Sequence, residues 1–162
     1  VAAARAIERL TGLRPGIKWV NDLYLNGRKI CGILTEAVTD AESGTVESIV
    51  VGIGVNVRSV PLPPDIADIA GALDVPGVTR CRLAAAIAAE LLDIAARPED
   101  RSYLADYRAR SVVIGRDVTF ERGGMTKNAR AIGIDDAGGL IVSLPDGAQE
   151  TLRTGEITLR LI

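Results

Sequence analysis

The chain has 162 residues, 48% of them hydrophobic, with 19 basic and 21 acidic side chains and a formal net charge of −2. This is the composition of a globular protein with one medium domain, or one small domain plus an appendage, and the near-neutral charge argues against a nucleic-acid-binding surface. Without a membrane-length apolar run, a secretory signal or any histidine, we expect a cytoplasmic protein that uses neither a histidine base nor a histidine-ligated metal.

The first ten residues have the pattern of a helix, and Gly12 is placed to cap its C-terminal end. This helix has no N-cap residue, and the sequence has no initiator methionine, since its single methionine is Met125. We therefore expect the chain to be a piece of a longer protein.

Residues 17–34 predict a β-hairpin, because Asn26-Gly27 lies between two apolar runs and favours a type I′ turn. Pairing the strands around this turn places Asp22 opposite Cys31. One face of the hairpin is then apolar, and the other combines opposite charges with smaller apolar side chains. The apolar face carries Ile17, Trp19, Leu23, Leu25, Ile30 and Leu34, with Asn21 as its polar member, and the other carries Lys18, Val20, Asp22, Tyr24, Lys29, Cys31 and Ile33.

A further strand is predicted at residues 48–57, where β-branched side chains alternate with smaller ones. Gly52, Gly54 and Asn56 fall together on one of its faces. Glycine inside a strand commonly marks the close approach of a ligand or of another backbone. Two interpretations therefore stay open for this face, a ligand surface and a close contact with a helix.

The second half of the chain predicts a loop, two helices and a set of short strands. Residues 58–78 are rich in proline and predict a connecting loop with a helix-like insert at 66–73. Helices are expected at 80–96, with Thr79 as N-cap, and at 99–109. Five short strands with glycine-rich turns then predict a small barrel. They are expected at 117–121, 130–134, 140–144, 150–153 and 156–161.

The predicted hairpin carries a long motif. Residues 18–22 read Lys-Trp-Val-Asn-Asp, and the strand after the turn continues with Arg28-Lys29, Gly-Ile-Leu at 32–34 and an acidic residue at Glu36. This segment closely resembles the Lys-Trp-Pro-Asn-Asp motif and following hairpin of biotin protein ligases. Val20 departs from the usual proline, and a β-branched residue preserves the extended backbone that the motif needs.

The resemblance implies an α+β fold. It predicts a biotin/lipoate ligase-like catalytic domain at residues 1–111, a mixed sheet with helices that is incomplete at its N-terminus, and an SH3-like C-terminal domain at residues 112–162. Ligases of this family place a strand and a glycine-arginine-rich loop over biotin ahead of the first helix, and this sequence contains neither. We therefore expect the segment alone to be inactive.

The resemblance also implies an activity: ATP-dependent formation of biotinyl-5'-AMP, then transfer of biotin to a lysine of a biotin carboxyl carrier protein. Lys29 matches the lysine that brings the carboxylate of biotin to the α-phosphate of ATP, and Asp22 matches the motif aspartate, so these two are the expected catalytic residues. Mg2+ would be bound chiefly through phosphates, with Asn56 as a weak ligand. The expected biotin contacts are Lys29, Gly32, Gly52 and Gly54, and the expected ATP or adenylate contacts are Asn21, Asn56 and Arg160.

Alternatives to a biotin ligase stay open. The segment could be a non-catalytic fragment for binding or for homodimer formation, because a sheet without its N-terminal strands exposes an edge. A lipoate ligase-like transferase shares the general fold, although the 18–22 motif and the C-terminal barrel match the biotin branch. On spacing alone, Arg160 is better explained as a solvated charge, and the resemblance, which places this strand near the ATP site, makes the two interpretations equal.

Overall fold

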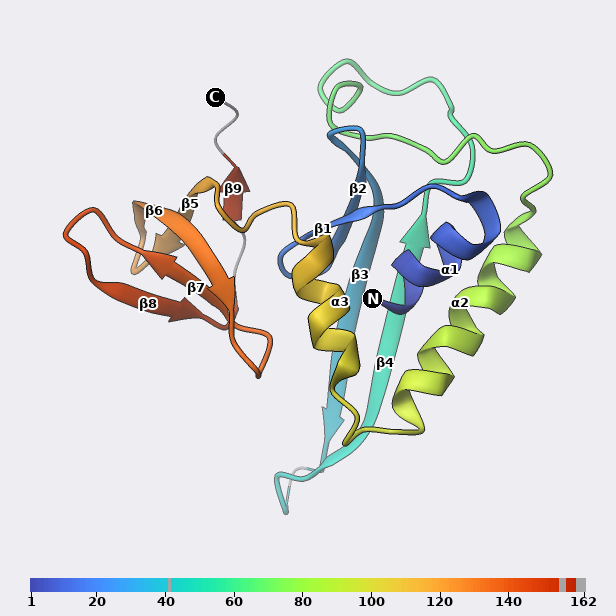
Figure 1. Cartoon of the computed structure of the whole chain (residues 1–162). Coiled ribbons are helices and arrows are strands. Elements are labelled where there is room, and N and C mark those ends of the chain that lie inside the picture. Colours follow the sequence, from blue (N-terminus) through green and yellow to red (C-terminus); the bar gives the residue numbers. More distant parts are fainter. Residues whose placement is uncertain (41, 155–156, 160–162) are drawn as a thin grey trace.

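Two sheets, each with an apolar core of its own, make up the computed structural model, which describes residues 1–40, 42–154 and 157–159. The first sheet has four strands in the order β1-β2-β3-β4, and the second has five in the order β8-β7-β6-β5-β9. Figure 1 shows the helices gathered around the first sheet and the second sheet standing beside it. The elements are α1 (Ala2–Thr11), β1 (Gly16–Lys18), β2 (Asp22–Leu25), β3 (Arg28–Thr39), β4 (Val46–Val55), α2 (Arg80–Ala95), α3 (Ser102–Arg110), β5 (Asp117–Arg122), β6 (Met125–Ile134), β7 (Leu140–Ser143), β8 (Gln149–Leu152) and β9 (Ile157–Leu159).

The helix predictions are largely confirmed. α1 ends at Gly12, whose φ of 72° suits glycine and whose N–H donates to the Glu8 carbonyl. α2 begins after Thr79, whose hydroxyl accepts a hydrogen bond from the N–H of Arg82, as expected of an N-cap. α3 begins later than predicted, and residues 66–73 form turns and an isolated bridge instead of a helical insert. None of the helices in the described ranges is long and apolar enough to span a membrane.

The hairpin turn at residues 26–27 has the left-handed backbone that its sequence predicts, with φ of 50° and 77°. The strand pairing beyond the turn differs from the prediction, because a β-bulge interrupts the ladder between Leu23 and Tyr24. Asp22 is therefore opposite Gly32, one residue beyond the predicted partner. A shift of one residue turns the following side chains to the other face of the strand.

The predicted faces of β3 are consequently wrong after the bulge. Cys31 is buried in the first core beside Ile30, and Ile33 packs against the same core. Leu34 instead lies on the opposite face with 61% of its surface exposed. The hydrophobic pattern could not reveal this, because apolar residues occupy both faces of the strand.

Trp19 was also predicted in the apolar face of the first sheet, and it lies in the other core. Its side chain is 3% exposed and packs among the buried residues of the second core, which include Val113 and Leu140. Its indole N–H donates a 2.9 Å hydrogen bond to the carbonyl of Gly138. A side chain from the turn between β1 and β2 thus completes the core of the second sheet.

β3 and β4 form a long antiparallel ribbon. The register pairs Gly32 with Gly54 and Leu34 with Gly52, so these four residues share one face. Ile53 lies on the other face, packed against the first core. The predicted alternation along β4 is confirmed, and in the described part of the chain no strand pairs with its outer edge.

The α+β class is confirmed, with two differences in detail. The strands of the first sheet all pair antiparallel, and parallel pairing is limited to isolated bridges at Ile17–Ser111 and Lys29–Ala70. In the second sheet β9 (Ile157–Leu159) pairs with β5, and the described residues record no pairing between β8 and β9. Within the described residues, the five strands expected of an SH3-like unit therefore form a sheet that does not close.

An ion-pair network joins α1 to α3. The Arg110 side chain is 6% exposed and donates to the carboxylates of Glu8 and Asp106, the latter at 2.7 Å. Asp106 also accepts a 2.9 Å hydrogen bond from Arg5. Burial opposes ionisation of Asp106, but the hydrogen bonds from Arg5 and Arg110 outweigh it and lower the pKa of this carboxyl.

Candidate active site

The predicted catalytic pair, Lys29 and Asp22, is brought together on the glycine face of the first sheet. The ammonium nitrogen of Lys29 lies 2.7 Å from a carboxylate oxygen of Asp22, and the two side chains are 40% and 20% exposed. Gly32 makes this contact possible, because a Cβ atom at that position would lie 3.3 Å from the lysine nitrogen and 3.6 Å from the aspartate oxygen. The bulge that moved Asp22 opposite Gly32 therefore also sets the position of the ion pair.

A strip of glycine backbone continues the surface next to this pair. Gly54 is the partner of Gly32 across the sheet, and Gly52 follows on the same face. A Cβ atom at Gly52 or Gly54 would meet only a backbone oxygen, at 3.8 and 3.9 Å respectively. Both glycines are exposed, so within the described residues no helix packs on them, and the interpretation of this face as a helix contact is not supported. We call Gly32, Gly52 and Gly54 the glycine floor.

Lys18 belongs to the same face but was not among the predicted site residues. It pairs with Asp22 across β1 and β2, and its ammonium nitrogen lies 5.8 Å from the centre of the Tyr24 ring. A second cation thus stands on the far side of the aspartate from Lys29. The sequence contained a signal for it, because Lys18 and Asp22 fall on one face in the predicted hairpin.

The structure describes two of the three expected nucleotide contacts, Asn21 and Asn56. The side-chain amide of Asn21 donates to the carbonyl of Ile33. The amide of Asn56 donates a 2.9 Å bond to the carbonyl of Gly71, which ties the 58–78 loop to β4. Arg160 lies outside the described residues.

A cavity of about 630 Å³ lies between the hairpin turn and the proline-rich loop. The loop is attached to β3 by two backbone hydrogen bonds of 2.8 Å, from Lys29 to Ile69 and from Gly71 to Lys29. The described residues contain no cluster of three or more acidic, cysteine or histidine side chains that could hold a metal ion. The polar residues that line the cavity are Asn26, Arg28, Asn56, Arg58, Ser59 and Asp74.

Comparison with known proteins matches two stretches of the chain to family models. Residues 1–56 match the model of the biotin/lipoate A/B protein ligase family. Residues 113–160 match the biotin protein ligase C terminal domain, which separates the chain from a lipoate ligase. The chain belongs to the biotin protein ligase family.

Curated relatives of this biotin protein ligase chain extend beyond it. The bifunctional ligase/repressor BirA of Bacillus subtilis is 32% identical over 160 residues, which cover 93% of this chain and 48% of the relative. The biotin–(acetyl-CoA-carboxylase) ligase of Mycobacterium tuberculosis is 35% identical over 134 residues, 80% of this chain and 47% of the relative. The chain thus spans about half the length of these relatives.

Solved structures agree with the assigned fold. The apo biotin protein ligase of Aquifex aeolicus has a TM-score of 0.80 at 22% identity, covering 98% of this chain and 71% of that protein. The same ligase in complex with biotin and ATP has a TM-score of 0.79 at 22% identity, with coverage of 98% and 67%. At this level of identity the likeness establishes the fold, and the roles of individual residues have to be argued from their geometry.

Proposed function

We propose that the protein to which this chain belongs is an ATP-dependent biotin protein ligase, and that the glycine floor holds biotin while Lys29 and Asp22 assist the chemistry. The observation that carries the proposal is the 2.7 Å Lys29–Asp22 pair beside an uncovered glycine strip. A domain boundary between residues 111 and 112 belongs to the same proposal. It is supported by the two cores, because apart from Trp19 the buried residues of the second core all lie at Val113 or beyond.

The chemistry proceeds in two steps. A carboxylate oxygen of biotin attacks the α-phosphorus of ATP, the bond to the β-phosphate oxygen breaks, and pyrophosphate leaves. The amine of an acceptor lysine then attacks the acyl carbon of biotinyl-5'-AMP, AMP leaves, and the amine loses a proton. The obstacle in the first step is the electrostatic repulsion between two anions. A fixed positive charge lowers the activation barrier by a few kcal/mol per donor.

Lys29 supplies that charge at the edge of the glycine floor. Its ion pair with Asp22 keeps the ammonium group pointing across Gly32 instead of into bulk water. Asp22 thereby orients Lys29, and it is also placed to accept a hydrogen bond from an incoming amine. Substrate binding needs little rearrangement of this pair, because the two side chains are already in contact before a ligand arrives.

We assign the ATP side of the reaction to the cavity beneath the 58–78 loop. Arg28, which pairs with Asp68, and Arg58, which donates to the carbonyls of Val75 and Val78, line this cavity and would supply guanidinium groups to phosphates. We expect the loop to cover the adenine. Mg2+ would be held mainly by phosphates and water, and the side-chain oxygen of Asn56 suits a minor additional contact. The bound ion would neutralise phosphate charge. Asn21 and Arg160 stay in the proposal as further adenylate contacts.

The acceptor that we propose is a biotin carboxyl carrier protein in the cytoplasm. The name of the Mycobacterium tuberculosis relative, a ligase for acetyl-CoA carboxylase, supports this class of acceptor. A homodimer is a further proposal, supported by the outer edge of β4, with which no described strand pairs.

The experiment that tests this function is a streptavidin blot of carrier protein incubated with ATP, magnesium, biotin and either the longer parent protein or the isolated 162-residue chain. The parent should label the carrier, and the isolated chain should not. Its glycine floor is open to water, so electrostatic interactions are screened and the adenylate is unprotected from hydrolysis. An unlabelled carrier together with no pyrophosphate release by the folded parent would refute the proposed function. A strong signal from the isolated chain would refute only its predicted inactivity.

A further inference from the structure

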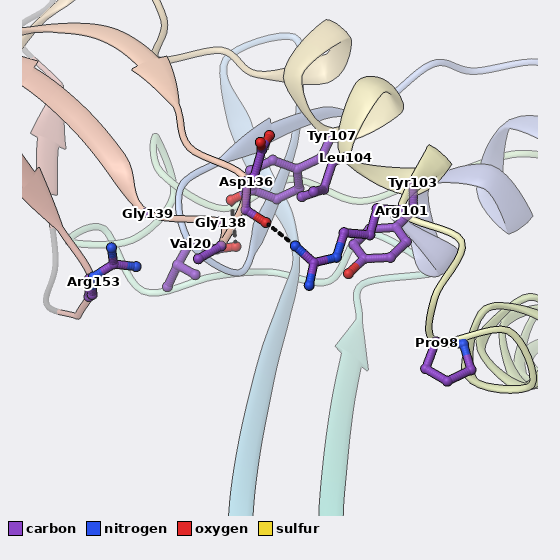
Figure 2. Close-up of a pocket in the computed structure, with 11 residues that line it drawn as sticks. Val20, Pro98, Arg101, Tyr103, Leu104, Tyr107, Asp136, Gly138, Gly139 and Arg153 are labelled. Carbon is purple, nitrogen blue, oxygen red and sulfur yellow. Dashed lines mark hydrogen bonds between the residues drawn. The ribbon is translucent and has the colours of Figure 1, made fainter.

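A separate cavity of about 500 Å³ lies where α3, Val20 and the β6–β7 turn meet (Figure 2). None of the residues to which we assign biotin or ATP contacts lines it. Its size is within the range of pockets that hold small molecules, about 300 to 1,000 Å³. The residues on which the inference depends are Val20, Arg101, Tyr103, Tyr107, Gly138 and Gly139.

The β6–β7 wall of this cavity is held in place by its own hydrogen bonds. A carboxylate oxygen of Asp135 accepts from the N–H of Ala137 at 2.8 Å and from that of Gly139 at 2.7 Å. The indole of Trp19 donates to the carbonyl of Gly138 from the other side. The turn is therefore shaped before any ligand arrives, which reduces the entropy lost on binding.

The opposite wall comes from α3. The hydroxyl of Tyr107 donates a 3.0 Å hydrogen bond to the carbonyl of Val20, and burial raises the pKa of Tyr107 to about 12. In Figure 2 the ring of Tyr103 lies beside the guanidinium group of Arg101 at the mouth of the cavity. The cavity thus combines aromatic walls with a cationic side chain at its opening.

The charge at this opening is unbalanced. Arg101 donates to the backbone carbonyl of Asp136 at 3.4 Å, and in the described part of the chain it has no carboxylate partner. The carboxylate of Asp136 is already engaged by Arg108 at 2.6 Å. Arg153, also at the rim, pairs with Asp135 at 3.2 Å and stays 63% exposed. An entering anion would therefore meet Arg101 without displacing an ion pair.

We propose that this cavity binds a small organic anion, with a carboxylate or phosphate group on Arg101 and an aromatic or hydrocarbon body against Tyr103 and Tyr107. Guanidinium groups bind both anions in the same planar, two-pronged way, so the geometry fixes the ligand class and leaves the anion to experiment. The inference does not depend on the ligase activity, because it uses a different surface and different residues.

The test is a titration of the ¹⁵N-labelled 162-residue chain, followed by the backbone amide signals of its glycines in NMR spectra. Benzoate and phenyl phosphate are the two probes, and inorganic phosphate is the arm without an aromatic body. Both probes should shift Gly138 and Gly139 saturably, with dissociation constants of the order of 1 mM. Gly32 and Gly54 report the proposed biotin site separately, and they should not shift in the same concentration range.

Arg101→Gln should weaken the tighter probe by about tenfold, the loss expected for one charge-assisted hydrogen bond. Arg97→Gln is the matched control, because it removes the same charge from an exposed arginine that pairs with Asp93 outside the cavity, and it should leave the affinity unchanged. Tyr103→Leu should weaken both aromatic probes while retaining the guanidinium group. Equal affinities in the Arg101 and Arg97 variants, unshifted Gly138 and Gly139 signals, or inorganic phosphate binding as tightly as phenyl phosphate would each overturn the inference.

Discussion

Replacing Trp19 with alanine should destabilise the protein severely, although this residue lies in the turn between β1 and β2 and the damage falls on the second core. Trp19 is 3% exposed and packs in that core, so the substitution leaves a large cavity. Substitutions of this type cost about 3 to 5 kcal/mol. For a chain of this size that corresponds to a fall of roughly 10 °C in the melting temperature.

The hydrogen bond to Gly138 can be separated from the packing with Trp19→Phe, which keeps an aromatic ring but removes the indole N–H. Its cost should be about 1 to 2 kcal/mol, the sum of one hydrogen bond and a small loss of volume. Leu92→Ala is the control, because Leu92 is 69% exposed, and it should change stability by less than about 0.5 kcal/mol.

The measurement for this series is urea unfolding followed by far-ultraviolet circular dichroism, with the midpoint and slope fitted for each variant. The expected order of destabilisation is Trp19→Ala, then Trp19→Phe, then Leu92→Ala. A cost below about 1 kcal/mol for Trp19→Ala, with an unchanged slope, would refute the reasoning. It would mean that the second core is stable without the Trp19 side chain.

Three further predictions concern the site and the α1–α3 network. In the longer parent enzyme, Lys29→Ala should lower pyrophosphate release by about 100-fold with an unchanged melting temperature, and near-normal release would remove Lys29 from the mechanism. Gly54→Val has room in the fold but fills the floor, so calorimetry should show biotin affinity falling far more than stability; unchanged affinity would favour a packing role. Asp106→Asn should cost about 1 to 3 kcal/mol at pH 7. The pKa of Asp106 is lowered in the folded state, so ionised Asp106 stabilises the fold at pH values above its unfolded pKa near 4, and this stabilisation is lost as the pH falls through the folded pKa. The urea midpoints of the unchanged protein and of Asp106→Asn should therefore converge in acid. A constant difference between the two midpoints across this pH range would contradict the argument.

Most elements of the fold could be predicted because their signals are local. Gly12, Thr79 and the 26–27 turn each adopt a backbone or capping geometry that the residue type itself favours. The alternation of Gly52 and Gly54 with β-branched residues likewise gave the correct face of β4. These features need no knowledge of distant parts of the chain.

The errors arose where tertiary structure decides between local alternatives. The bulge at Leu23 and Tyr24 has no distinctive sequence signal, and it reversed the faces of β3 from Cys31 onward. Trp19 was assigned to the nearest apolar face, because strand alternation cannot reveal a core that is formed by residues a hundred positions later. Lys29 and Asp22 were nevertheless predicted on one face of the hairpin, and the structure places them in contact although the predicted register is off by one.

The attachment of the 58–78 loop to β3 limits how that loop can move. Its hydrogen bonds run to the backbone of Lys29 itself, through Ile69 and Gly71, and Asn56 adds a side-chain tie. The loop therefore cannot move away as one unit without breaking its hydrogen bonds to the backbone of the proposed catalytic lysine. The exposed stretch at 60–65 makes none of these hydrogen bonds, whereas Ser59 is held by Asp74. Opening and closing over a nucleotide would then be a motion of that stretch about a fixed hinge at Ile69 to Gly71. Any displacement of this hinge would shift the backbone of Lys29, to which it is hydrogen-bonded.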